Sequence, residues 1–466
     1  MNDIYYNIYM SFTSPIGTRY KAPVLSKIWC QNSKIKHMRQ LWIDLAIFQK
    51  QLGVEQITDE GIEEMKANIE NIDIEKINEH EKKCKHDIVA NIHTYGELCP
   101  TAKPFIHLGV TSNFINDNVD LIIIKKSLNY IDELLNKLFV TLKDKSLFYI
   151  TAPTIAYTHL QPAQLTTIGK RFTLWNSDIK IDIDQLKEIY KSLVFRGVKG
   201  TVGSEDSILK LFDNKSHLCD ILNSKFCCKY GFEKLTICGQ TYSRKYDVII
   251  FQLLSSICQS IYKMMNDIRL LSSKFEMFED FSSEQVGSSA MPYKTNPMSC
   301  EKICSLCRYV INQEICMKQT YINQWLERTL DDSAIKRIIY PECFLLVEHI
   351  IKETTNIIST LFINISKISV DIMNHMPFIV SEEIIIEGVK LGYDRQEIHE
   401  RLRVILINYK FSNSYITDNG NNNIFSIFKN DELLNNIIEK INISTEPINY
   451  IGRCEEQICE FYTYND

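Results

Sequence analysis

The residue types best suited to chemistry are concentrated in the segment 287–297, which reads GSSAMPYKTNP. Ser288 and Ser289 carry hydroxyl groups, and a serine becomes an effective base only where a cation or a backbone donor stabilises its alkoxide. Lys294 can supply that charge, Asn296 can donate hydrogen bonds to an anionic substrate, and Gly287 allows the loop to move. The segment predicts either a catalytic loop or a plain turn between helices, and both interpretations stay open at this point.

A second candidate is the pair Thr158 and His159 in the segment YTHLQPAQ. Pro162 suits the first turn of a helix, so His159 is expected just before a helix N-terminus. A histidine can give or take a proton near neutral pH, but a lone histidine is more often a structural residue.

Two further pairs raise the same question. His86 and Asp87 lie in KKCKHDIVANIH, where basic residues precede a helix. Thr111 and Ser112 lie in HLGVTSN, where hydroxyl groups can cap a helix. Capping and surface charge explain both pairs without any catalytic role.

Long helical segments must position these candidates. Leu41, Leu45 and Phe48 form one apolar stripe in the segment 35–52, which Gly53 ends. Alternating strand patterns are scarce, and the best of them is a short one near 233–238. The sequence therefore predicts an all-α fold with a central bundle of long helices. The segments with almost no glycine or proline are 116–150, 163–196, 242–281, 298–340 and 342–376.

Turn-forming residues cluster between these helical segments, at 100–113, 151–162, 196–204 and 282–297. Such clusters should collect at helix ends, where polar chemistry on a helical scaffold usually lies.

Composition excludes several classes of protein. The net charge of −6 gives no electrostatic footprint for nucleic acid. The first residues show no basic region leading into an apolar run, and no stretch of about 18 uncharged apolar residues occurs. We therefore expect a soluble, cytoplasmic protein without a membrane span.

The fifteen cysteines are expected to be reduced thiols rather than disulfides. Cys300, Cys304 and Cys307 have ligand-like spacing, but no second ligand pair follows them, which favours packing on a helix face over a zinc site. The sequence also has no P-loop, because Gly169-Lys170 lacks the preceding glycine. RGVKGTVGS does not have the glycine spacing of a dinucleotide site, and HExxH and GxSxG are absent.

Together, the loops resemble one superfamily. GSSAMPYKTNP is similar to the GSSxMxxKxNP signature of the fumarase/aspartase superfamily, whose members eliminate fumarate from a succinyl-bearing substrate. HLGVTSNFINDN and THLQPAQLTTIGKR precede it in the superfamily's order. Within the superfamily, the chain resembles the adenylosuccinate lyase branch of the animal-like type, from about residue 10 to at least residue 403. This closer likeness is carried by the segments 14–20 (SPIGTRY), 85–96, 195–204, 238–247 and 325–337.

The resemblance implies a three-domain, all-α fold, with an N-terminal helical domain at 1–111, a central long-helix bundle at 112–364 and a C-terminal helical domain at 365–466. It implies β-elimination of fumarate from adenylosuccinate to give AMP, and the same elimination from SAICAR to give AICAR. Ser288 would be the general base and His159 the general acid, which Glu301 supports. Lys294 would hold the substrate carboxylate, and His86 would assist proton transfer. The implied substrate contacts are Arg19, Tyr20, Lys85, His86, Asp87, Thr111, Ser112, Thr158, Gln240, Ser289, Lys294, Asn296, Lys302, Arg328, Ser333 and Arg337.

The resemblance further implies a homotetramer of D2 symmetry, whose active sites draw loops from three chains, with no metal and no organic cofactor. Lys85 and Lys302 replace arginines of close relatives, which keeps charge but loses bidentate geometry, and Thr295 and Ser299 also stand where those relatives carry arginine. The stretch 404–447 matches poorly. Argininosuccinate lyase and fumarase chemistry remain alternatives, as does a non-catalytic protein on the same fold, like some crystallins.

Overall fold

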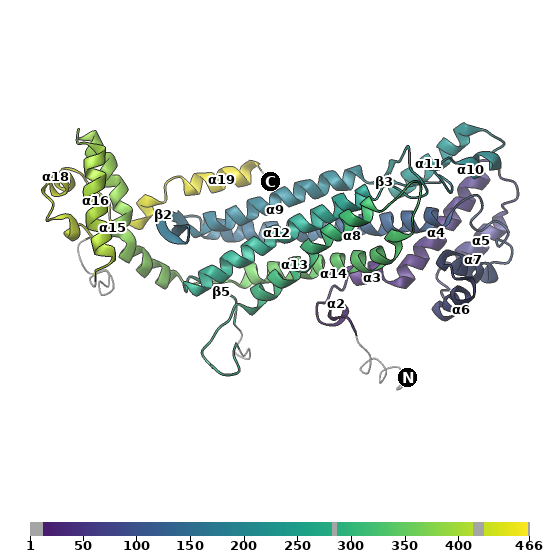
Figure 1. The fold of residues 1–466 in the computed structure, drawn as a ribbon, viewed down its shortest axis with the longest axis horizontal. Helices are drawn as coiled ribbons and strands as arrows, with labels where there is room; N and C mark the ends of the chain where they lie inside the picture. Colours follow the sequence, from purple (N-terminus) through teal and green to yellow (C-terminus); the bar gives the residue numbers. More distant parts are fainter. Residues whose placement is uncertain (1–12, 282–286, 413–423, 465–466) are drawn as a thin grey trace. The chain divides into compact units, whose positions relative to one another are not determined.

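Long helices form the middle of the chain, as predicted (Figure 1). The computed structural model describes residues 13–281, 287–412 and 424–464. Apolar side chains at helical spacing explain these helices. In α8, for example, Ile115, Ile122, Ile131 and Leu135 are each at most 4% exposed. The long helices are α8 (Ser112–Phe148), α9 (Ile168–Ser192), α12 (Lys245–Ser273), α13 (Met298–Ile322) and α14 (Asp331–Thr360).

Two predicted helical segments are each divided. The segment 298–340 was expected to be continuous, but it is interrupted at 323–330, between α13 and α14. Leu326 has a positive φ of 49° in this interruption, and the hydroxyl of Thr329 accepts a hydrogen bond from the N–H of Asp331. The segment 342–376 is likewise divided between α14, the strand β6 (Phe362–Ile363) and α15 (Ile365–Lys390). Polar and positive-φ residues end these helices without any glycine or proline.

Proline gave the wrong boundary at two places, Pro341 and Pro162. We expected helices to end at Pro341, but α14 continues through it. At Pro162 the expected helix start is also wrong, because Gln161–Thr167 forms the strand β2 and the helix begins at Ile168. The strand β2 pairs antiparallel with β1 (Pro153–Thr158), with an irregularity between Ile155 and Tyr157.

The chain forms two compact units, which we describe separately. The first comprises the residues up to Asn136, Ile181–Tyr262 and Cys304–Glu353, and the second comprises Lys137–Lys180, Lys263–Ile303 and the residues from Thr354 onward. Each of the five long helices contains a boundary between these ranges. The two units do not test the predicted division into 1–111, 112–364 and 365–466, which remains a prediction.

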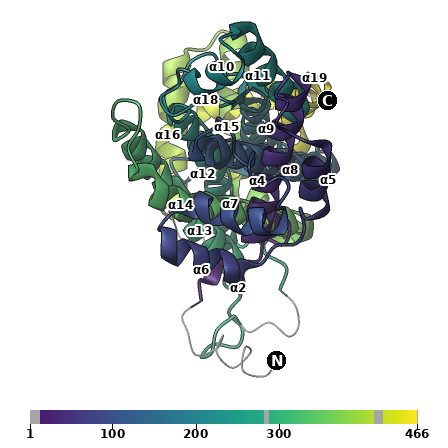
Figure 2. The same ribbon diagram turned by 90° about the vertical axis from the view of Figure 1, so that its right-hand side faces the viewer.

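The shorter helices of the first unit begin near the N-terminus, and α6 and α7 lie side by side (Figure 2). The short parallel strands β3 (Val194–Phe195) and β4 (Glu233–Lys234) pair with each other, so the expected strand near 233–238 exists but is short. These helices are α2 (Pro15–Thr18), α3 (Leu25–Trp29), α4 (Gln31–Gln51), α5 (Asp59–Ala67), α6 (Ile74–Cys84), α7 (Asp87–Leu98), α10 (Asp206–Leu211) and α11 (Ser216–Tyr230).

In the second unit, α15 packs against α16 and α18, and β5 (Met277–Phe278) pairs antiparallel with β6 (Figure 1). The remaining elements are α16 (Arg395–Lys410), η1 (Ser426–Phe428), α18 (Glu432–Lys440), η2 (Pro447–Tyr450) and α19 (Cys454–Tyr464).

Two further predictions concern burial. All fifteen cysteines lie in the described residues and all are free thiols, and Cys300, Cys304 and Cys307 are each at most 2% exposed, as expected for core packing. Among the described helices, α12 alone has the length and hydropathy of a membrane span. Because 61% of that apolar window is buried, α12 matches a core helix equally well.

Candidate active site

Four of the predicted substrate contacts line one cavity in the first unit. This cavity has a volume of about 270 Å³, and Asp87, Arg328, Ser333 and Arg337 are among its lining residues. Asp87 is the first residue of α7, whereas Ser333 and Arg337 lie in the first two turns of α14. A guanidinium N–H of Arg337 donates to the Asp87 carboxylate at 2.7 Å, which joins these two helix starts. The cavity therefore presents two arginines together with a hydroxyl group, a set suited to a phosphate group.

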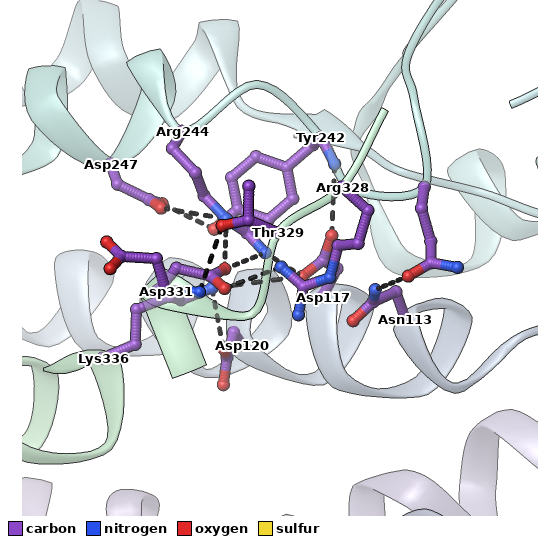
Figure 3. Close-up of polar contacts among 12 residues, drawn as sticks. Asn113, Asp117, Asp120, Tyr242, Arg244, Asp247, Arg328, Thr329, Asp331 and Lys336 are labelled. Atoms are coloured by element: carbon purple, nitrogen blue, oxygen red, sulfur yellow. Dashed lines mark hydrogen bonds and ion pairs between the residues drawn. The ribbon is translucent and has the colours of Figure 1, made fainter. Parts of the chain in front are cut away.

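A buried ionic cluster contributes side chains to the lining of this cavity, and Figure 3 shows its polar contacts. Arg244 precedes α12 and donates to Asp117 of α8 at 2.8 Å and to Asp332 of α14 at 2.7 Å. The amino group of Lys336 lies 3.1 Å from the Asp120 carboxylate. These side chains come from segments far apart in the sequence, and none of them is among the predicted site residues. Their only signals were the Asp-Asp pair that opens α14 and the arginine within CGQTYSRKYD.

Gln240 connects the cluster's surroundings to the loop between α13 and α14. Its side-chain oxygen accepts a hydrogen bond from Asn113 at 3.0 Å, and its backbone N–H donates to the carbonyl of Glu327 at 3.0 Å. Gly239 lies so close to this loop that a Cβ there would come 2.7 Å from the Glu327 carbonyl oxygen. Thr111 is buried and Ser112 begins α8.

The other predicted contacts of the first unit are outside the lining of this cavity. Arg19 is exposed after α2, and the Tyr20 ring lies 5.6 Å from the ring of His349. Lys85 is exposed and adopts a left-handed conformation with φ of 55° at the end of α6. His86 is the exposed N-cap residue of α7, and its Nδ1 lies 3.3 Å from the Asp87 carboxylate.

The signature loop lies in the second unit, and internal hydrogen bonds hold its shape. The Ser288 hydroxyl oxygen accepts from the backbone N–H groups of Ala290 at 3.3 Å and Met291 at 3.1 Å. The Asn296 side chain donates to the carbonyl of Gly287 at 2.8 Å. Gly287 itself allows a close approach, because a Cβ there would collide with the carbonyl oxygen of Lys294. The first part of the predicted loop, 282–286, lies outside the described residues.

Three predicted site residues of this loop region line a second cavity. Lys294, Asn296 and Glu301 belong to the lining of this cavity, which measures about 800 Å³. Glu301 is in the first turn of α13, where its side chain is 53% exposed and lies 3.8 Å from Arg269. Ser289 is exposed and Lys302 is half-buried.

His159 occupies a tight turn rather than the helix start that Pro162 suggested. Thr158 pairs with Gln161 across the β1–β2 hairpin, which leaves His159 and Leu160 as its two turn residues. Both have left-handed backbones, with φ of 53° and 60°, as a two-residue hairpin turn of this kind requires. Thr158 and His159 are both exposed.

Comparison with known proteins identifies the class. A family model described as lyase matches residues 13–312. The fold agrees, because a 3-carboxy-cis,cis-muconate lactonizing enzyme from Pseudomonas putida has a TM-score of 0.80 at 17% identity, covering 96% of this chain and 97% of that chain. A fumarate lyase from Mesorhizobium has a TM-score of 0.79 at 18% identity, covering 96% and 99%. At such identities the likeness concerns the fold alone, and it confirms the predicted fumarase/aspartase-like fold.

Sequence relatives narrow the class further. Adenylosuccinate lyase of Saccharomyces cerevisiae is 38% identical over 456 residues, covering 97% of this chain and 94% of that protein. Adenylosuccinate lyase of Schistosoma mansoni is 40% identical over 395 residues, covering 84% and 82%. The chain therefore belongs to the lyase family and, within it, to the adenylosuccinate lyases, which confirms the predicted family.

Proposed function

We propose that this protein eliminates fumarate from adenylosuccinate to give AMP. The observation that carries the proposal is the full-length likeness to adenylosuccinate lyases, at 38% identity over 97% of the chain. The cavity in the first unit supports it, because Arg328 and Arg337 supply charge for a nucleotide phosphate in a protein of net charge −6. The same elimination from SAICAR, giving AICAR, belongs to the proposal, since both substrates carry a succinyl group on nitrogen and a ribose phosphate.

Ser288 is the general base in this proposal. It takes the proton from the carbon beside a succinyl carboxylate, and the electron pair left behind forms the double bond of fumarate as the carbon–nitrogen bond breaks. The two backbone N–H groups that donate to its hydroxyl oxygen support this role, because they would stabilise an alkoxide. Lys294 and Asn296 would hold the carboxylate on which negative charge develops, and Ser289 would add a further donor.

His159 is the general acid, which protonates the departing nitrogen so that it does not leave as an anion. The strained backbone at the tip of the hairpin supports a functional role. A left-handed non-glycine residue costs about 1 to 3 kcal/mol, and such residues cluster at active sites. Glu301 would support the charged imidazole, as a neighbouring carboxylate favours the protonated form. Thr158 would add a hydroxyl group beside the substrate carboxylate, and His86 would assist proton transfer.

The remaining proposed contacts surround the nucleotide. Arg328, Ser333 and Arg337 would bind its phosphate and ribose with Arg19 and Tyr20. The rest of the pocket would come from Lys85, Asp87, Gln240 and Lys302. Thr111 and Ser112 would add hydroxyl groups that help Lys294 and Asn296 to hold the substrate carboxylate.

A homotetramer with active sites shared among three chains completes the proposal. His159 and Lys294 are both exposed within the single chain, as expected of groups that meet only in an assembly. Large apolar side chains on the long helices are exposed too, such as Leu174 at 56% and Ile322 at 69%. The free state of all fifteen cysteines supports a reducing, cytoplasmic location.

Offering the purified protein adenylosuccinate, argininosuccinate or malate, and following the ultraviolet absorbance, tests the function. Turnover of adenylosuccinate but of neither other compound is the expected result. A soluble tetramer that fails to convert adenylosuccinate would overturn the proposal, and conversion of argininosuccinate or malate instead would assign another reaction of the superfamily.

A further inference from the structure

Asp332 shares its carboxylate between two arginines. It is the second residue of α14, and only 1% of its surface is exposed. Its Oδ1 accepts a hydrogen bond from Nη1 of Arg328 at 2.6 Å, whereas its Oδ2 accepts from Nε of Arg244 at 2.7 Å. The Asp332 carboxylate therefore links Arg328, whose side chain is 20% exposed, to Arg244, whose side chain is only 2% exposed.

Arg244 is itself fixed from other directions. A second guanidinium nitrogen donates to Asp117 at 2.8 Å, and the guanidinium lies 4.4 Å from the centre of the Tyr242 ring (Figure 3). The backbone N–H of Tyr242 donates to the other Asp117 oxygen at 3.1 Å, and its hydroxyl donates to Asp247 at 2.5 Å. Such a buried, multiply bonded arginine is a rigid anchor for the carboxylate that it contacts.

The charges of the cluster keep Asp332 ionised. Burial alone would raise the pKa of this carboxyl, but Arg244, Lys336 and Arg328 together outweigh that effect and hold its pKa below the ordinary value. Asp332 therefore remains a charged acceptor for Arg328 throughout the neutral pH range.

Arg328, unlike the buried Asp332, is partly accessible, since its side chain is 20% exposed and lines the cavity. Only one of its guanidinium nitrogens is held by Asp332, which leaves other N–H donors for a ligand. An arginine that is oriented before binding loses less side-chain entropy when a phosphate arrives.

We propose that Asp332 is a positioning residue, which orients Arg328 through its anchor on Arg244 so that the guanidinium meets the substrate phosphate. This inference rests on the proposed nucleotide substrate, and Asp332 is not among the predicted substrate contacts.

Competition by AMP and by adenosine tests the inference, because only AMP carries the phosphate. In the Asp332→Asn variant we expect the inhibition constant of AMP to rise about tenfold or more, and that of adenosine to change by less than about twofold. The KM of adenylosuccinate should rise together with the inhibition constant of AMP. The kcat should change less, since the phosphate lies away from the bond that breaks.

The Asp247→Asn variant is the matched control. It also removes a carboxylate from beside Arg244, at 3.9 Å, but Asp247 has no contact with Arg328 among the interactions of the described residues. It should lower stability without changing the ratio of the AMP and adenosine inhibition constants. If Asp332→Asn does not fold, Asp332→Glu keeps the charge but displaces the carboxylate, and should show the same phosphate-specific loss.

A double-mutant comparison separates positioning from a general structural effect. In the Arg328→Gln background, adding Asp332→Asn should cause little further loss of AMP affinity, because the residue through which Asp332 acts is already absent. Additive losses of AMP affinity in the double mutant, or equal losses of affinity for AMP and adenosine, would overturn the inference. The proposed function would still hold if the unmodified protein turns over adenylosuccinate. Failure of the unmodified protein to bind AMP would overturn both.

Discussion

Asp87 and Arg337 meet at 2.7 Å, so one ion pair connects the first residue of α7 with the second turn of α14. The Arg337 side chain is 59% exposed, and this contact orients it beside the cavity. We expect Asp87→Asn to lower kcat/KM for adenylosuccinate about tenfold, mainly through KM, as measured by steady-state kinetics. Asp59→Asn removes a comparable surface partner, of Lys50, and should leave the kinetics unchanged. Equal kinetics for both variants would contradict an orienting role for Asp87.

The signature loop depends on the absence of a side chain at one position. A Cβ at Gly287 would collide with the Lys294 carbonyl and would come 3.0 Å from the Phe281 ring. Gly287→Ala should therefore displace Ser288 and lower kcat by about a hundredfold or more, with little change in the melting temperature. Gly96→Ala is a suitable comparison, because the three atoms nearest to its new methyl group would all belong to the flexible Lys103 side chain. Retention of near-normal kcat by Gly287→Ala would show that this loop shape is not the reactive one.

Shared active sites predict complementation between inactive variants. His159→Ala and Ser288→Ala should each be inactive, but mixed tetramers would contain some sites with both native residues. Random mixing of equal amounts should restore about a quarter of the normal activity. The measurement is turnover after denaturation and joint refolding, with mass analysis to show that hybrids have formed. Hybrid tetramers without any activity would contradict sharing.

A half-buried histidine predicts loss of stability in acid. Nδ1 of His107 accepts the indole N–H of Trp42 at 2.9 Å, and burial followed by the charge of His86 lowers the pKa of His107 from 6.5 to about 4. Between these values the unfolded chain binds a proton that the folded chain does not, so the free energy of unfolding falls as the pH drops below 6.5 and is retained above it.

We expect a loss on the order of 1 to 3 kcal/mol from this group by about pH 4. His37, whose pKa burial and two lysines also lower to about 4, should add to the loss. Denaturant unfolding followed at several pH values measures the slope. His107→Gln keeps an acceptor for Trp42 and should flatten the slope, and an unchanged slope would contradict this origin.

Much of the fold could be predicted because helical periodicity is a local property. The stripe of Leu41 and Leu45 gave α4 and the absence of helix breakers gave α8, so the all-α architecture followed. The β1–β2 hairpin could not be predicted in this way, because its turn consists of His159 and Leu160 instead of the glycine or asparagine that usually marks such turns. Pro162 suits a helix start as well as a strand at the edge of a two-stranded sheet.

The candidate site likewise contains residues that could be predicted from the sequence and residues that could not. Arg328, Ser333 and Arg337 were predicted because a short motif contains all three, and they do line one cavity together. Asp332 lies in the same motif, but its Asp-Asp pair looks like an ordinary acidic first turn of a helix. Its role depends on Arg244, which no local pattern could bring to it.

The Arg244 cluster also has a consequence for how the chain folds. Its partners Asp117 and Asp332 are 127 and 88 residues from it in the sequence, so the cluster can form only after distant segments have met. Until then, the carboxylates of Asp117 and Asp332 and the guanidinium of Arg244, which the native state buries, remain hydrated, and the cavity of the first unit lacks part of its lining. A ligand that binds the completed cavity stabilises the folded state relative to states in which the cluster has not formed. AMP or adenylosuccinate should therefore increase the yield of refolding, because the bound nucleotide stabilises the folded state.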